Sequence, residues 1–171
     1  MRVLLGSEPA HTETGRIQLE SVIILIAGVS FVAGVIHIAA SIDHYRDFAV
    51  YTVVFALIAT FQIAWAVTIA RGCSRQVLIL GAALNFAIIG LWVASRTVGV
   101  PIAPRPWVPE DIGAPDLMAT VAESVIVIGT TCALMSLQSP FAQRVLARLA
   151  PVLLAAILLC VTFGFGAGHA G

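Results

Sequence analysis

SVIILIAGVSFVAGVIHIAASI, residues 21–42, is an almost unbroken apolar run in which His37 is the single ionisable side chain. A helix of this length is long enough to cross the roughly 30 Å hydrocarbon core of a bilayer. Further apolar runs of similar length follow at residues 48–70, 76–95, 117–137 and 149–167. Because backbone polar groups in lipid must be satisfied within the span, the sequence predicts an all-α integral membrane bundle of five transmembrane helices. The spans form a single membrane domain over residues 1–171.

The composition agrees with a membrane protein. The chain has 171 residues, of which 60% are hydrophobic and 11% charged, and its mean hydropathy is +1.02. Soluble domains carry about 25% charged residues. The net charge is zero, and no basic patch for nucleic acid is present. The three cysteines show no CxxC spacing, so a disulfide framework is not expected. The expected partners are the lipid bilayer and other membrane subunits or further copies of the chain.

The distribution of arginine predicts the orientation. All nine basic residues are arginines, and six of them lie in the N-terminal segment and in the connections at 71–75 and 138–148. The other three are accompanied by acidic residues. Positively charged connections favour the cytoplasmic side, so we expect a multi-pass protein of the cell membrane with a cytoplasmic N-terminus. With five spans, the C-terminus and the 97–115 connection are then extracytoplasmic.

Small and polar side chains form a stripe along each of two predicted helices. The steps of three and four residues put each stripe on one helix face, which is the face that packs against other helices rather than lipid. The first stripe comprises Ala27, Ser30, Gly34, His37, Ser41 and His44, and the second comprises Asp116, Thr120, Glu123, Val127 and Thr130. If the two helices are neighbours, His37 and Glu123 lie at the same depth.

These side chains are candidate metal ligands at the extracytoplasmic end. Imidazole and carboxylate suit zinc or copper(II), and Met118 adds a soft ligand for copper(I). The predicted outer ligands are Asp43 and His44, with Asp116 or His169 completing the set. His37 and Glu123 form a deeper pair that adjusts or extends this site. No second histidine lies deep in another predicted span, which argues against a bis-histidine haem unless a partner supplies a ligand. The His37 and Glu123 pair could equally join two helices by a hydrogen bond or exchange a proton.

Three further features accompany this site. Gln62 and Asn85, near the middle of their spans, predict an amide hydrogen bond between helices. Arg96 either extends to lipid headgroups or pairs with Asp116, Asp43 or Glu110. Pairing with Asp116 would remove a candidate ligand. The 97–115 connection carries five prolines, which favour rigid backbone and suit a lid over the bundle mouth or a docking surface.

The segments HIAASIDHYRDF (37–48) and LWVASRTVGVPIAPRPWVPEDIGAPDLMATVAE (91–123) resemble a group of small, uncharacterised multi-pass bacterial membrane proteins. The shared pattern is a His, an acidic-His pair, a Ser-Arg-Thr-x-Gly-x-Pro motif and a late Glu. Its positions here are His37, Asp43, His44, Ser95, Arg96, Thr97, Gly99, Pro101 and Glu123. Where this chain has Asp43, glutamate is expected in the similar proteins. The resemblance covers about half the chain and implies one constellation of residues, without an activity.

The sequence therefore predicts a small membrane protein for copper or zinc handling, or an accessory subunit of a membrane enzyme complex. A purely structural subunit is the alternative, and a proton-coupled transporter is a third possibility that lacks a continuous polar path to the cytoplasm. No serine or cysteine has an evident base beside it, so a self-contained catalytic site is not expected.

Overall fold

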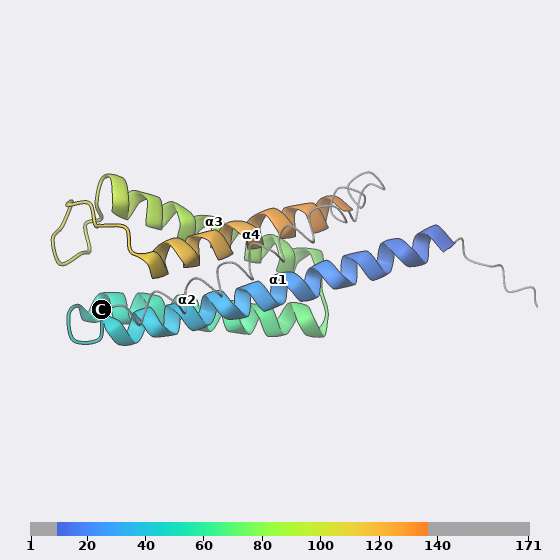
Figure 1. Ribbon diagram of the computed structural model, residues 1–171, viewed down its shortest axis with the longest axis horizontal. Coiled ribbons are helices and arrows are strands. Elements are labelled where there is room, and N and C mark those ends of the chain that lie inside the picture. The colour runs from blue at the N-terminus through green and yellow to red at the C-terminus, as the bar shows by residue number, and fades with distance from the viewer. Residues whose placement is uncertain (1–9, 137–171) are drawn as a thin grey trace, which may run out of the picture.

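The computed structural model describes residues 10–136, which form four α-helices and no strand (Figure 1). The helices are α1 (Ala10–Asp43), α2 (Ala49–Arg71), α3 (Arg75–Thr97) and α4 (Ala114–Ser136). Each contains a stretch long and apolar enough to cross a membrane, namely Leu19–Asp43, Ala49–Arg71, Arg75–Thr97 and Ala114–Met135. The predicted all-helical membrane architecture is confirmed for this part of the chain.

Four of the five predicted spans are present within a few residues of their expected bounds. The fifth, at 149–167, lies outside the described residues, as does His169. Helix α1 begins at Ala10 rather than near residue 21. The polar stretch before the apolar run contains Glu, Gln, Arg and Leu, which favour helix, so the helix extends beyond its apolar part.

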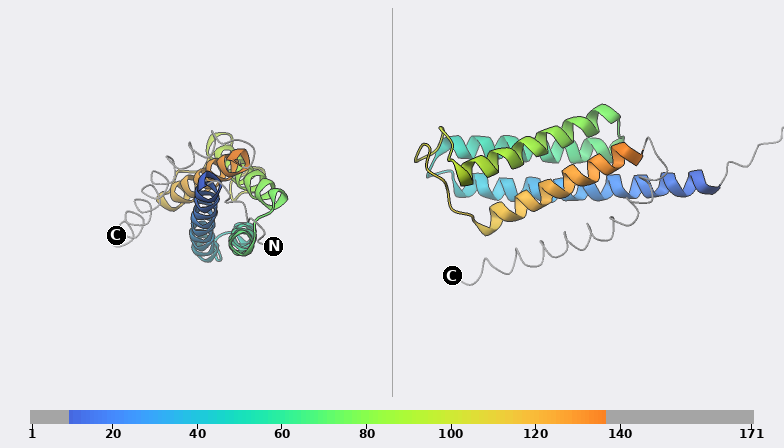
Figure 2. Two further views of the ribbon diagram at one scale, coloured as in Figure 1. Left: turned by 90° about the vertical axis from the view of Figure 1, so that its right-hand side faces the viewer. Right: turned by 90° about the horizontal axis from the view of Figure 1, so that it is seen from above.

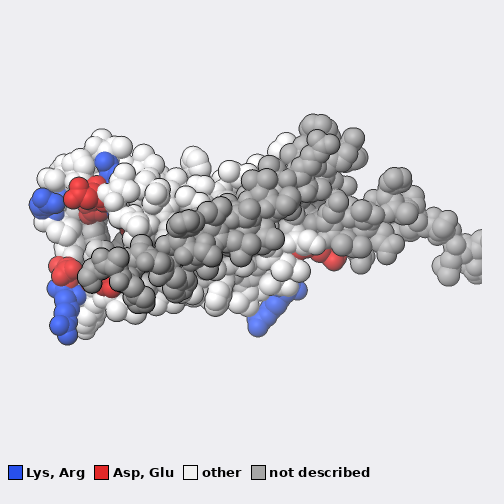
Figure 3. Space-filling model, in the orientation of Figure 1, with Lys and Arg blue, Asp and Glu red and all other residues white. Residues whose placement is uncertain are grey.

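Charged side chains gather toward the two ends of the described helices. On the face shown in Figure 3, they lie around the 98–113 loop and the α1–α2 turn, and again near the opposite end. The described surface between these two groups is uncharged. An apolar band between two charged ends is the surface that a membrane-spanning bundle presents to lipid.

Helix α1 packs against both α2 and α4, and α4 also packs against α3 (Figures 1 and 2). Helices α2 and α3 contact each other little and meet near the turn that joins them, where Trp65 lies against Gly81. They diverge toward the end that carries the α1–α2 turn and the 98–113 loop (Figure 1).

A large cluster of buried apolar side chains fills the half of the bundle near the α2–α3 turn. Its members come from all four helices: Val22, Ile26, Ala27, Val29, Trp65, Ala66, Ile69, Leu78, Val125, Ile126 and Ala133. The predicted stripe on α1 faces the bundle, and Ser30, Gly34 and His37 are buried. The Ser30 hydroxyl donates to the carbonyl oxygen of Gln62 at 2.9 Å, which ties α1 to α2.

Gly81 sets how closely α2 and α3 approach. A Cβ atom at this position would lie 2.1 Å from Cε2 of the Trp65 ring, which is too close for any real contact. We expect Gly81→Ala to lower the free energy of unfolding by about 1–3 kcal/mol, because the rigid indole must move. The measurement is reversible unfolding in mixed detergent, followed by circular dichroism.

Gly90→Ala is the matched control on the same helix. A Cβ atom there meets nothing within 4 Å, so this variant should gain up to about 1 kcal/mol from helix propensity. Equal stability changes for the two variants would show that the contact of Gly81 with Trp65 does not limit the packing of α2 on α3.

Candidate functional site

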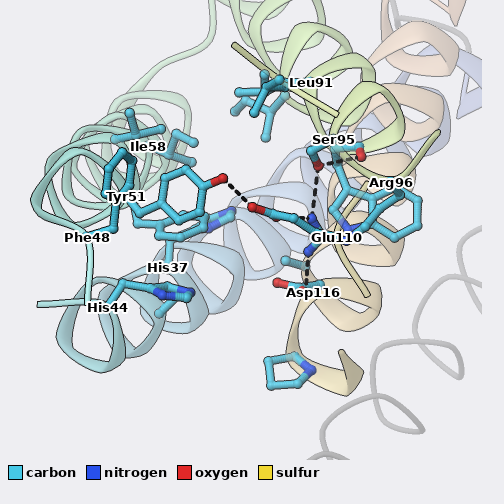
Figure 4. Close-up of a pocket in the computed structure, with 18 of the residues that line it drawn as sticks. His37, His44, Phe48, Tyr51, Ile58, Leu91, Ser95, Arg96, Glu110 and Asp116 are labelled. Atoms are coloured by element: carbon cyan, nitrogen blue, oxygen red, sulfur yellow. Dashed lines mark hydrogen bonds and ion pairs between the residues drawn. The ribbon is translucent and has the colours of Figure 1, made fainter. Parts of the chain in front are cut away.

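A cavity of about 680 Å³ lies between the α1–α2 pair and the α3–α4 pair, at the end where α2 and α3 diverge (Figure 4). Its walls are mostly apolar and include Val50, Val54, Ile58, Ile88, Leu91 and Ala119. Val50 and Leu91, on α2 and α3, are 40% and 49% exposed and form part of the rim. Residues of the 98–113 loop line the cavity at the end of the bundle.

His37 and Glu123 meet in the lining of this cavity. Nε2 of His37, on α1, lies 2.9 Å from Oε1 of Glu123, on α4, and the two residues are only 5% and 1% exposed. Helices α1 and α4 are therefore neighbours, and the matched depth of these two side chains that the sequence predicts is confirmed. A carboxyl group at this depth costs several kcal/mol unless it is neutral, paired or hydrated, and His37 provides a partner.

A chain of amide groups extends this pair into the bundle. Gln62 Nε2 lies 3.4 Å from Oε1 of Glu123 and 3.3 Å from Oδ1 of Asn85, and Asn85 Nδ2 donates to the carbonyl oxygen of Gly81. The predicted contact between Gln62 and Asn85 is thus confirmed, and it is joined to the acid group. Gln62 Oε1 and Thr130 Oγ1 are buried without a hydrogen-bond partner in the described part of the chain.

Phe55 of α2 separates His37 of α1 from His44, the residue that follows the last residue of α1. Its ring stacks on His37 with a centroid distance of 5.8 Å and on His44 with a centroid distance of 5.5 Å. Because the histidines are two helical turns apart, about 10 Å along the axis, the phenyl ring lies between the imidazoles. One metal ion cannot contact both imidazoles while Phe55 occupies this position.

The predicted outer ligands do not come together in the described residues. His44 lines the cavity, whereas Asp43 lines a separate surface crevice beside Arg46. Consecutive helical residues point about 100° apart, which places these two side chains on different faces. Asp116 is bound to Arg96, and Met118 is not among the residues that line the cavity.

Residues 10–136 contain no group of three or more His, Cys, Asp or Glu side chains that could hold a metal ion. His169 lies outside this range. Copper or zinc binding thus stays a prediction from the sequence. Within the described residues, His37 with Glu123 is the one pair of predicted ligands in direct contact.

Arg96 lies at the mouth of the cavity and joins two carboxylates. Its Nη1 is 2.6 Å from Oε2 of Glu110, and its Nη2 is 2.6 Å from Oδ2 of Asp116. Nη1 also donates to the hydroxyl of Ser95 at 2.9 Å. The guanidinium lies over the ring of Trp92 with its Cζ 5.9 Å from the ring centroid. Of the two fates expected for Arg96, pairing is the one observed.

Glu110 fastens the 98–113 loop over the mouth. Its backbone N–H donates to the carbonyl oxygen of Ser95 at 3.0 Å, one side-chain oxygen binds Arg96, and the other accepts a hydrogen bond from the hydroxyl of Tyr51. Through this one side chain the loop connects α2 with α3 across the cavity (Figure 4). The pairing of Glu110 with Arg96 was one of the three expected for this arginine, whereas the contact of Glu110 with Tyr51 was not predicted.

Gly99 allows the loop to fold back. Its φ of +74° is in the left-handed region that favours glycine, and a Cβ atom would lie 2.5 Å from the carbonyl carbon of Trp107. The Trp107 N–H then donates to the carbonyl oxygen of Val100 at 3.1 Å. This tight return brings Glu110 back to the end of α3.

Comparison of the chain with protein-family models, with curated protein sequences and with solved structures gives no match. A fold does not by itself specify an activity, so the function must be inferred from the residues of the cavity.

Proposed function

We propose that this protein binds a small, largely apolar molecule inside its helical bundle. The observation that carries the proposal is that His37 and Glu123 lie in the lining of an apolar cavity rather than within the packed core. A pair with a purely structural role needs no cavity beside it. Ligand sites are typically cavities of about 300–1,000 Å³ with apolar walls and a few polar groups that orient the ligand.

The rim supports entry of this molecule from the bilayer. Val50 and Leu91 are exposed apolar side chains on either side of the opening between α2 and α3. The loop held by Glu110 covers the end of the bundle. A molecule dissolved in lipid would therefore pass between α2 and α3 without displacing the loop.

Two adjacent valines of α2 provide a matched test. Val54 lines the cavity, whereas Val53 is 56% exposed and is not part of its lining. Neutral benzophenone, a photoreactive probe, is added to the full-length protein in nanodiscs, and labelled residues are mapped by mass spectrometry. We expect saturable labelling of cavity residues, which Val54→Trp reduces about tenfold or more by filling the space and Val53→Trp leaves unchanged.

Labelling that falls equally in both variants, or that appears only on lipid-facing residues, would contradict binding in the cavity. Labelling of lipid-facing residues in the same sample serves as the reference for probe concentration in the membrane. A folded Val54→Trp variant with unchanged cavity labelling would also count against the proposal.

We further propose that the cavity end faces the extracytoplasmic side of the cell membrane, and that the N-terminus is cytoplasmic. The arginine asymmetry supports this orientation. Cys73, exposed in the α2–α3 turn, should then react with an impermeant maleimide only after permeabilisation, with Cys132 and Cys160 replaced by alanine. Partial desolvation raises the pKa of the Cys73 thiol, so labelling should be faster at pH 9 than at pH 7. If Cys73 reacts in intact cells, the α2–α3 turn is extracytoplasmic and the orientation is the reverse of the one proposed.

Metal handling and a role as an accessory subunit remain the predictions from the sequence. Elemental analysis of the purified protein and of His44→Ala separates the first from small-molecule binding. Near-stoichiometric copper or zinc that is lost in the variant would favour a metal site at His44.

A further inference from the structure

The cavity lining is rich in negative charge. Five carboxylates and one guanidinium line it, together with two imidazoles: Asp47, Glu110, Asp111, Asp116 and Glu123, then Arg96, then His37 and His44. With all five carboxylates ionised, the formal charge of these groups is −4 when the imidazoles are neutral and −2 when both are protonated. Asp47 and Asp111 are exposed and screened by solvent, and Glu110 and Asp116 share Arg96. Glu123 is the carboxylate that lies deepest.

One oxygen of Glu123 makes no hydrogen bond within the described residues. The side chain is 1% exposed and lines the cavity. Both of its hydrogen bonds, to His37 and Gln62, use Oε1, and Oε2 has none within the described residues. A neutral imidazole can donate through Nε2, so the contact with His37 need not supply positive charge. A buried carboxylate favours a cation or a strong donor beside it.

The walls restrict the kind of cation. An inorganic ion needs several ligands to replace its hydration shell, and no three candidate side chains meet in residues 10–136. Val54, Ile58, Ile88 and Leu91 offer only apolar surface. A cation that carries its own apolar substituents satisfies both the walls and the carboxylate.

Two buried donors at the mouth favour an acceptor instead. Arg96 Nε and Trp92 Nε1 have no hydrogen-bond partner in the described part of the chain. These donors are buried, as Glu123 is, but the charge of Arg96 is already shared by Glu110 and Asp116. The indole of Trp92 carries no charge. The balance of charge around the cavity therefore favours a cation.

We propose that the molecule bound in this cavity is a hydrophobic organic cation, such as an ammonium with aromatic or alkyl substituents, and that Glu123 is its counter-ion. This inference rests on the proposed function, because it assigns a ligand class to the same cavity. It predicts that, among molecules with the same ring system, the cavity binds the positively charged one in preference.

Three probes that share one photoreactive ring system test the charge preference. They are (4-benzoylbenzyl)trimethylammonium, neutral benzophenone and anionic 4-benzoylbenzoate, each added to the full-length protein in nanodiscs. The readout is labelling of cavity residues relative to lipid-facing residues in the same sample, which corrects for partitioning. We expect cavity labelling by the cation to exceed labelling by the neutral probe about tenfold. The excess over the anionic probe should be larger still.

Glu123→Gln should abolish the preference for the cation and leave neutral labelling unchanged. Asp43→Asn is the control, because it removes an acidic residue near the same end that lies outside the cavity lining, and it should retain the preference. If Glu123→Gln also loses neutral labelling, the variant has lost the cavity, and the wild-type charge preference alone decides.

The outcomes separate the two proposals. Saturable cavity labelling by benzophenone without preference for the cation, or with preference for the anion, overturns the organic cation and leaves small-molecule binding intact. No cavity labelling by any probe overturns both. A preference that survives in Glu123→Gln removes Glu123 as the counter-ion.

Discussion

His37→Phe is expected to lower the free energy of unfolding by about 3–5 kcal/mol, because it leaves the buried carboxyl of Glu123 without its imidazole partner. Phenylalanine fills a similar volume, so the loss is electrostatic rather than a cavity. The remaining contact of Glu123, from Gln62, is long at 3.4 Å. The measurement is equilibrium unfolding in mixed detergent, with the wild type and the variant under identical conditions.

The double variant distinguishes pairing from packing. Glu123→Leu leaves a neutral imidazole unpaired, which costs less, about 1–3 kcal/mol. Combining His37→Phe with Glu123→Leu removes both polar groups and should be more stable than His37→Phe alone. Additive losses in the double variant would mean that the 2.9 Å contact contributes no interaction energy.

Arg96→Met is expected to cost about 2–4 kcal/mol and to release the 98–113 loop. It leaves Glu110 and Asp116, about 28% and 29% exposed, next to one another without a cation, and carboxylates at short distance repel each other. Hydrogen exchange should then speed up at the backbone N–H groups of Glu110 and Trp107, which bond to Ser95 and Val100 in the wild type.

Arg105→Met is the control for this variant. Arg105 lies in the same loop, is exposed and makes no side-chain ion pair in the described structure, so its loss should leave exchange unchanged. Arg96→Lys should be intermediate, because an ammonium cannot bind two carboxylates with the planar geometry of a guanidinium. Unchanged exchange in Arg96→Met would mean that other contacts hold the loop.

The sequence predicted what depends on helical periodicity. The lengths of the apolar runs predict the four described spans. The steps of three and four residues place His37 and Glu123 on stripes that face each other. The contact of Gln62 with Asn85 follows from their similar position along adjacent spans. In each case the helix converts spacing in the chain into position on a face.

Features that depend on the loop path and on helix divergence were not predicted. Glu110 was only one of three carboxylates expected to pair with Arg96, and its contact with Tyr51 was not foreseen. Both contacts depend on the loop folding back after Gly99, a path that no periodic pattern encodes. The cavity exists because α2 and α3 separate, a property of the packing at the far end. Grouping Asp43 with His44 treated neighbours in sequence as neighbours in space, although consecutive helical residues diverge by about 100°.

The close packing of Trp65 on Gly81 fixes α3 against α2 at a point outside the cavity lining. Leu91 lies ten residues further along α3, which is about 15 Å of helix. A tilt of about 5° at Gly81 would therefore move Leu91 by about 1.3 Å over that length, enough to change which molecules pass between α2 and α3. Substitutions at residue 81 or at Trp65 are therefore expected to change the width of the opening without altering a residue that lines the cavity.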